Sequence, residues 1–252
     1  MKAKFIKPKM VRLLNSLSID MVLIKKGSFL MGEGSKKKKV TIENDFYIGK
    51  YPVTVVEYMY FINDVKKHYP IWLEEGSKYN IKTGTNDLFK KMPNLQNQNA
   101  PIVGIGWHDA IAYCKWLSKK TGYNYRLLKE GEWEFACRAG TTTKWSFGDD
   151  KKELEEYAWY SKNSYRLGKK HKNFGIQEVG KKLPNPWGLY DMHGNVWEWC
   201  EDWYDSNKDK KVLRGGSWLD AAGSTRSAGR YDGFGVNRSV GIGFRLLRTL
   251  PS

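Results

Sequence analysis

The fifteen residues from Asn185 to Trp199, NPWGLYDMHGNVWEW, give the strongest indication of how this chain folds. Gly194 stands just before Asn195, where a glycine suits a tight backbone turn that a side chain would block. A fold built largely from turns needs large rigid side chains to fill its interior. We therefore expect the tryptophans of this region to lie in the core: Trp197, Trp199, Trp203 and Trp218.

Upstream of that stretch, the spacing of apolar residues is first strand-like and then helical. Residues 21–31 predict two short strands around Lys25-Lys26-Gly27, and residues 40–47 continue the strand character. Thr54 and Glu57 have the spacing of a capping box, so a helix is expected to begin there. Apolar residues then follow at helical intervals: Tyr58, Phe61, Ile62 and Val65.

The middle of the chain predicts a long insertion and two more helices. Residues 69–100 are rich in Asn, Gly and Lys and indicate an insertion or loop. Residues 109–120 predict a second helix and 130–138 a short third one, and no long helical period returns after Thr141. The second helix is expected to turn these residues inward: Ile111, Cys114, Trp116 and Leu117. Helices early and irregular strands late predict an α+β fold, a single domain over 17–252 after a polar lead at 1–16.

Composition excludes several classes of protein. The 252 residues are 40% hydrophobic, enough for a core, and no stretch approaches the ~20 apolar residues of a membrane helix. The basic first ten residues lead into no apolar segment, so no signal peptide is visible. Three cysteines without zinc-site spacing predict neither a disulfide scaffold nor a zinc site: Cys114, Cys137 and Cys200.

The formal net charge of +16 raises the possibility of a nucleic-acid-binding protein. Most of the charge is lysine, in runs such as 36–39 and 181–182, and no stripe of Arg forks with aromatic platforms is present. We therefore interpret the lysines as a solvated surface and expect no nucleic-acid partner. A steep salt dependence of DNA affinity would indicate the opposite.

Several motifs occur together along nearly the whole chain, at residues 21–32, 51–54, 101–110, 125–136, 185–199, 214–218 and 243–245. In this order they resemble the formylglycine-generating-enzyme (sulfatase-modifying-factor) family. The resemblance implies a C-type lectin fold with two main helices, short twisted antiparallel strands and much irregular structure. Arg214 and Arg245, from the last two motifs, are expected to hold loop carbonyls and carboxylates through their forked donors.

The resemblance also identifies what the chain lacks. The family's oxidase holds copper through two cysteines five residues apart, and the corresponding residues here are Asp220 and Thr225. Neither a carboxylate nor a hydroxyl replaces the soft thiolates that select Cu(I). Related enzymes use an iron-binding histidine set, whereas the four histidines here are widely scattered. We expect no catalytic residues and no enzyme activity.

Calcium is a separate implication of the resemblance. The family binds calcium around the Gly-Asn-x-Trp-Glu turn, which corresponds here to Asp191, Glu198 and the carbonyls near Gly194 and Val196. The alternative is that the two carboxylates simply accept hydrogen bonds from backbone amides in the turn. We expect no bound cofactor and leave calcium as the one open question.

Residues 219–243, LDAAGSTRSAGRYDGFGVNRSVGIG, have an unusual composition. They contain no Lys, Glu, Gln, Met or Trp, although Lys and Glu are common elsewhere. The residue types present fit codons that end in a pyrimidine, as arise when Asn codons are mutated at their adenines. The segment resembles the variable region of the variable proteins of diversity-generating retroelements, which use the same C-type lectin frame. The alternative is a β-rich segment that simply lacks long charged side chains.

On this interpretation a fixed frame carries a changeable face. Trp218, Arg226, Arg230 and Arg245 would hold the backbone. The expected ligand-binding residues are Leu219, Asp220, Ala221, Ser224, Gly229, Tyr231, Asp232, Gly233, Phe234, Val236, Ser239 and Val240. Tyr231 and Phe234 are the expected hot spots, because aromatic rings supply contact area at low entropic cost.

The function that follows is a non-catalytic, monomeric binding protein for a protein or glycoprotein ligand. It would be displayed on the cell surface, as a lipoprotein or otherwise, after removal of a leader not present in this sequence; a cytoplasmic location is the alternative. The runner-up function is an enzyme or regulatory relative of the sulfatase-modifying family that uses an unidentified site.

Overall fold

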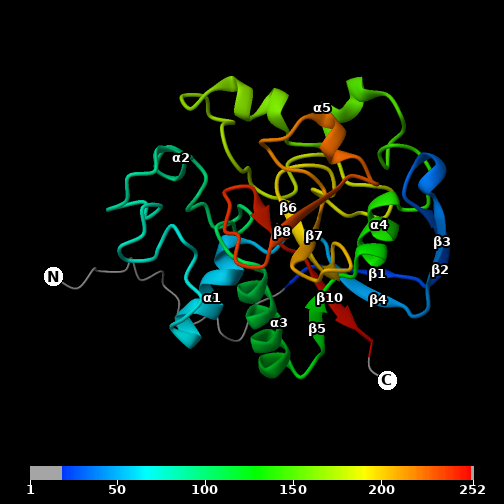
Figure 1. Cartoon of the computed structure of the whole chain (residues 1–252), viewed down its shortest axis with the longest axis horizontal. Coiled ribbons are helices and arrows are strands. Elements are labelled where there is room, and N and C mark those ends of the chain that lie inside the picture. The colour runs from blue at the N-terminus through cyan, green and yellow to red at the C-terminus, as the bar shows by residue number, and fades with distance from the viewer. Residues whose placement is uncertain (1–18, 251–252) are drawn as a thin grey trace.

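The computed structural model describes residues 19–250, arranged as three small sheets with helices packed around them (Figure 1). The predicted polar lead at 1–16 lies outside the described residues. The helices are α1 (Val55–Val65), α2 (Asp87–Lys90), α3 (Trp107–Thr121), α4 (Glu130–Arg138) and α5 (Leu154–Tyr157). Among residues 19–250, no helix is both long enough and apolar enough to span a bilayer.

The first sheet joins strands from both ends of the described chain. Its order is β1 (Met21–Ile24), β4 (Phe46–Gly49), β10 (Leu246–Thr249) and β5 (Tyr125–Leu127), all antiparallel. A second, two-stranded sheet pairs β2 (Gly27–Met31) with β3 (Lys38–Ile42) and packs on α4. The two strands predicted within 21–31 are therefore present, but each pairs with a different partner.

The third sheet carries the region of interest. Its order is β8 (Arg230–Phe234), β7 (Lys210–Arg214), β6 (Trp197–Trp203) and β9 (Ile242–Gly243), with only β6 and β9 parallel. Within this sheet β8 is an edge strand, bonded to β7 on one side. Residues near the end of the chain thus form an exposed margin of a sheet whose interior is tryptophan-rich β6.

The predicted helix starts are set by capping side chains. The Thr54 hydroxyl accepts from Glu57 N while the Glu57 carboxylate accepts from Thr54 N, as the capping-box spacing predicted. Helix α3 begins two residues before its predicted start, because the Asp109 carboxylate accepts from Gly106 N and makes Asp109 the third helical residue. Helix α4 has the predicted bounds.

The predicted core residues are confirmed except for one tryptophan of β6. On α3, Cys114 and Leu117 are buried, and Ile111 and Trp116 are half-buried and pack against the same hydrophobic cluster. Trp203 is 43% exposed, because a register irregularity between Trp199 and Trp203 shifts the end of β6. The other three tryptophans are buried: Trp197, Trp199 and Trp218.

The 69–100 insertion has little regular structure, as predicted, yet it is firmly packed. Trp72 is buried and its indole donates to Val103 O at 2.8 Å. Phe89 of α2 and Leu95 are also buried in the main hydrophobic cluster. The insertion therefore forms a fixed wall of the molecule, seen at the left of Figure 1.

A candidate binding face on the 219–243 segment

The predicted segment runs from the β7–β8 connection to β9 and is held from beneath by Arg214. This buried guanidinium donates to Gly229 O, to Ser227 O at 3.0 Å and to the Glu134 carboxylate. Charge-assisted bonds of this kind are stronger than neutral ones and fix a loop that has no ladder of its own. The expected role of Arg214 is confirmed.

Arg245 does the same beneath the end of the segment. Its guanidinium donates to the Glu198 carboxylate at 2.8 Å and to Tyr190 O at 2.7 Å. It also donates to the carbonyls of Gly49 and Lys50, both at 2.9 Å. One buried side chain thus ties the first sheet, the 185–199 stretch and β6 together.

The frame arginines within the segment also have fixed partners. Arg226 donates to Gly223 O at 2.8 Å and pairs with Glu33. Arg230 donates to Glu130 at 2.7 Å and to Tyr204 O at 2.8 Å. These bonds fix the backbone on either side of the 3-10 helix η5 (Ala222–Thr225) and at the start of β8.

The structure divides the twelve predicted ligand-binding residues by exposure. Four are exposed: Ala221, Tyr231, Phe234 and Val236. Five are half-buried: Leu219, Asp220, Ser224, Asp232 and Ser239. Three are buried, so a side chain there cannot contact a ligand and the prediction is wrong at these positions: Gly229, Gly233 and Val240.

The three corrections have steric causes. A Cβ on Gly229 would lie 2.5 Å from Ser224 O, and one on Gly233 would lie 2.8 Å from the Trp199 ring. The Val240 side chain is part of the main hydrophobic cluster. Free substitution at these three positions is therefore excluded by the packing beneath them.

Two carboxylates of the segment already have partners. Asp220 Oδ2 accepts from Ser217 N at 3.0 Å, from the Ser217 hydroxyl and from Trp197 Nε1 at 2.9 Å. Asp232 forms an ion pair with Lys210 at 3.1 Å. Asp220 therefore stabilises the turn at 217–220 and belongs to the frame more than to the face.

Tyr231 and Phe234 project from opposite sides of β8, because residues three apart on a strand point to opposite faces. The Tyr231 ring stacks on Trp197 with centroids 5.6 Å apart, yet the residue is 57% exposed. Phe234, 48% exposed, has Lys210 Nζ 5.4 Å from its ring centroid. A partner that contacts both must wrap around the edge of the sheet.

One surface residue was missed by the sequence interpretation, which assigned Trp203 to the core. Its ring covers Lys211 Nζ at 3.3 Å, and Trp107 covers the same ammonium group at 4.1 Å. Lys211 of β7 pairs with Trp203 on one side and with Gly233 on the other, so the exposed Trp203 ring lies on β6, with β7 between it and β8. Because side chains alternate along a strand, the sequence of residues 197–203 indicates that Trp203 lies on the same face as Trp197 and Trp199. It does not indicate that this face is exposed to solvent at Trp203.

Comparison with known proteins decides the family. The family described as sulfatase-modifying factor enzyme 1-like domain matches residues 12–250. The chain belongs to this family. Treponema denticola variable protein 1 superposes with a TM-score of 0.72 and 24% identity over 94% of this chain and 97% of that one, so the two share a fold. The expected α+β, C-type lectin fold of the formylglycine-generating-enzyme type is thereby confirmed.

Relatives in the family include both inactive and active proteins. The bovine inactive C-alpha-formylglycine-generating enzyme 2 is 39% identical over 127 residues, 48% of this chain and 40% of that protein. The mouse formylglycine-generating enzyme is 27% identical over 258 residues, 79% of this chain and 66% of that protein. The chain thus spans about two fifths of the bovine protein and two thirds of the mouse one.

The two positions that hold copper in the family's oxidase have other partners here. The Thr225 hydroxyl accepts from Trp145 Nε1 at 3.0 Å and donates to Ala222 O at 2.9 Å, and Asp220 is engaged as described above. A hydroxyl and a carboxylate that already have partners do not fit Cu(I). Burial raises the pKa of all three thiols of the chain, that of Cys137 to about 12, so none is a ready thiolate.

The positions implied for calcium do not fit a shared divalent ion either. Both Glu198 oxygens accept from Arg245, and Oε2 also accepts from Trp133 Nε1 at 2.7 Å. Asp191 accepts from Gly180 N at 2.8 Å and from the Asn195 amide at 3.2 Å. Arg245 already supplies the countercharge of Glu198, so the carboxylates serve the turn itself.

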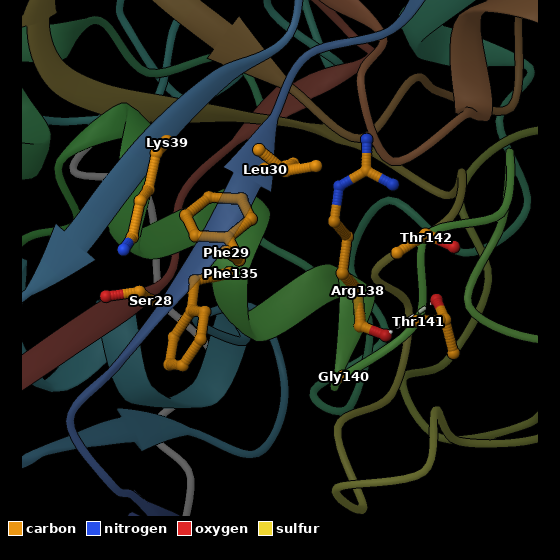
Figure 2. Close-up of a pocket in the computed structure, with 9 residues that line it drawn as sticks. All are labelled: Ser28, Phe29, Leu30, Lys39, Phe135, Arg138, Gly140, Thr141 and Thr142. Carbon is orange, nitrogen blue, oxygen red and sulfur yellow. Dashed lines mark hydrogen bonds between the residues drawn. The ribbon is translucent and has the colours of Figure 1, made fainter.

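Two cavities of the molecule lie away from the segment. One of about 350 Å³ is formed by β2 and the end of α4, where Phe29 and Phe135 pack together (Figure 2). Arg138 at its edge donates to Gly32 O at 2.9 Å and to Glu134 at 2.8 Å. A second, of about 920 Å³, lies between the β3–β4 turn and the start of α4. Neither is lined by any of the twelve residues.

Burial shifts the pKa values of two buried groups, His193 and Asp191, in opposite directions. Burial lowers the pKa of His193 to about 4 from 6.5, while its ring bonds to Thr225 O at 2.8 Å and to Ser146 Oγ at 2.9 Å. Burial raises the pKa of Asp191 to about 6 from 3.8. Between pH 4 and 6.5, His193 is protonated in the unfolded chain but neutral in the folded one, so its contribution to the free energy of unfolding increases as the pH rises. Between pH 3.8 and 6, Asp191 is ionised in the unfolded chain but protonated in the folded one, so its contribution decreases as the pH rises.

These opposing contributions predict a nearly flat stability profile for these two groups in the intact chain. Asp191→Asn removes the carboxyl contribution, so the free energy of unfolding of the variant should rise by a few kcal/mol between pH 4 and 6.5. Urea unfolding at half-unit pH intervals measures this slope, with His193→Gln as the converse variant. Equal slopes in the intact chain and Asp191→Asn would contradict the assignment.

Proposed function

We propose that the chain is a non-catalytic ligand-binding protein whose binding face is the exposed part of residues 219–243. One observation carries this proposal. Three large apolar side chains are exposed within six residues of an edge strand and its following loop: Tyr231, Phe234 and Val236, the last 74% exposed. The side chains that hold the surrounding backbone are almost completely buried: Arg214, Trp218 and Arg245. Exposed apolar surface over a rigid support is typical of an interaction site.

The same contrast supports a variable protein of a diversity-generating retroelement. The exposed side chains at 221, 231, 234 and 236 can be replaced without losing a frame contact, because the frame bonds use the arginines and backbone carbonyls. Tyr and Phe beside Ser, Gly and Asp resemble the composition of antibody paratopes. The shared fold with the Treponema denticola variable protein is consistent with this function.

The remaining parts of the proposal concern the ligand and its location. Side chains exposed on an edge strand and its following loop suit a protein or glycoprotein ligand better than a small molecule, which usually binds in a cleft. We place the protein at the cell surface as a monomer, with no nucleic-acid partner. The oxidase activity of the family is expected to be absent because its copper positions carry Asp220 and Thr225.

The test of binding uses an array of purified cell-surface proteins and glycoproteins. The combined variant Tyr231→Ala/Phe234→Ala is expected to weaken binding to any hit at least about tenfold, as removal of hot-spot rings does. The matched control is Tyr123→Ala/Leu183→Ala, which removes two side chains of similar exposure, 48% and 50%, outside the segment. Equal binding by the two variants would show that residues 219–243 do not form the binding face.

The test of catalysis is independent of the ligand. The intact chain, supplied with Cu(I), should leave the cysteine of a sulfatase-derived peptide unchanged, as read by mass spectrometry. Formylglycine in the product would favour the enzyme alternative, which the similarity to the mouse enzyme keeps open. Asp220→Cys/Thr225→Cys provides the control for copper binding.

A further inference from the structure

A strongly basic loop lies beside the candidate face. Residues 162–172, KNSYRLGKKHK, contain five Lys or Arg and no acidic residue. Lys162 pairs with Glu155. Within residues 19–250 the other four cations form no ion pair, and all are exposed: Arg166, Lys169, Lys170 and Lys172. The loop therefore presents four exposed positive charges that are not part of an ion pair in the described residues.

This loop is attached firmly to the frame of the face. The buried Ser164 hydroxyl closes the loop against Asn173 O at 2.6 Å and Gly175 O at 2.9 Å. Phe174 packs edge-on against Trp218 with centroids 5.1 Å apart, and Ser161 N donates to Asp220 O at 2.9 Å. In Figure 1 the loop lies at the top of the view. The backbone of the loop thus has a fixed position relative to the segment.

The loop also carries exposed apolar side chains. Tyr165 and Leu167 are exposed, and the Tyr165 ring lies 5.9 Å from that of Trp218, the residue before Leu219. Building on the proposed function, we propose that the 162–172 loop is the second half of the binding face. The partner is a protein whose contact surface places clustered carboxylates beside an apolar site.

The chemistry favours a protein over a nucleic acid. Leu167 and Val236 are aliphatic and offer area to bury but no plane for a base to stack on. One face of the Tyr231 ring is already covered by Trp197. Three of the four free cations are lysines, which pair with carboxylates as point charges and lack the fork that recognises phosphate. Complementary charge at such a rim accelerates encounter and sets the choice of partner.

The experiment compares the binding of three fluorescent probes by anisotropy: a random glutamate–tyrosine copolymer, polyglutamate and single-stranded oligo(dT). The intact chain should bind the copolymer most tightly. The loop variant Arg166→Gln/Lys169→Gln/Lys170→Gln/Lys172→Gln should weaken that binding at least about tenfold. The control changes four exposed lysines of the β2–β3 hairpin, Lys36→Gln/Lys37→Gln/Lys38→Gln/Lys39→Gln, and lowers the net charge equally. It should weaken binding about twofold or less, with unchanged thermal unfolding in both variants.

Three results would overturn the inference. Equal weakening by both variants would show a response to total charge alone. Tightest binding to oligo(dT) would indicate a nucleic-acid partner instead of an acidic protein. The absence of copolymer binding at tens of micromolar would rule out an acidic protein as the partner. None of these results decides the proposed function, because the array comparison of the Tyr231/Phe234 variant uses chains with an intact loop.

Discussion

Arg245→Met is expected to destabilise the folded chain by about 3–5 kcal/mol. The guanidinium is buried with the Glu198 carboxylate, and it satisfies the carbonyls of Gly49, Lys50 and Tyr190. Methionine fills the space but leaves a buried negative charge without its partner and three acceptors without donors. Urea unfolding followed by tryptophan fluorescence measures the loss.

A second substitution separates the charge from the packing. Adding Glu198→Gln to Arg245→Met removes the uncompensated charge and should recover part of the lost stability. Arg248→Met serves as the control, because Arg248 is half-buried and stacks on Tyr47 and Tyr123; its loss should cost less than about 1 kcal/mol. A loss in Arg245→Met no greater than in this control would contradict the role assigned to Arg245.

Gly229→Ser is expected to cost about 3 kcal/mol, at the upper end of the range for overpacking. Its Cβ would lie within 2.5 Å of Ser224 O and 2.9 Å of Arg226 O, and both neighbours are backbone atoms that cannot rotate away. The carbonyl of Gly229 is also a partner of Arg214, so a shift of this turn disturbs the frame.

Gly223→Ser is the matched control in the same segment. A Cβ at Gly223 has no neighbour within 4 Å and the residue is exposed, so its stability should change by less than about 0.5 kcal/mol. Thermal and urea unfolding of the two variants side by side give the comparison. If Gly229→Ser is as stable as Gly223→Ser, then Gly229 belongs to the changeable face after all.

Features encoded by neighbouring residues could be predicted from the sequence. The capping pair Thr54 and Glu57 defines the start of α1, and the apolar spacing over 130–138 defines α4. Strand partners could not be predicted, because β4 pairs both with β1 and with β10. Leu247 of β10, the partner of Ile48 in β4, lies 199 residues further along the chain. Pairing at that distance depends on the whole core.

The sequence predicts which segment forms the candidate site, but not which residues of that segment are exposed. Composition singled out 219–243, and the expected anchoring by Arg214 and Arg245 is confirmed. Composition does not reveal which glycines face a tryptophan, so Gly233 was grouped with its exposed neighbours. The 162–172 loop was not assigned to the face, because its contact with Trp218 joins residues distant in sequence.

The position of β8 at the edge of its sheet has a consequence for self-association. An open strand edge bearing exposed aromatic rings is a template on which a second copy of the chain can add a strand. Antiparallel addition centred on Asp232, the middle residue of β8, would set two carboxylates directly opposite each other, which is unfavourable. Asp232 therefore disfavours this register of self-pairing in the present sequence, and because position 232 is one of the predicted changeable residues, a replacement without a negative charge would lose that effect.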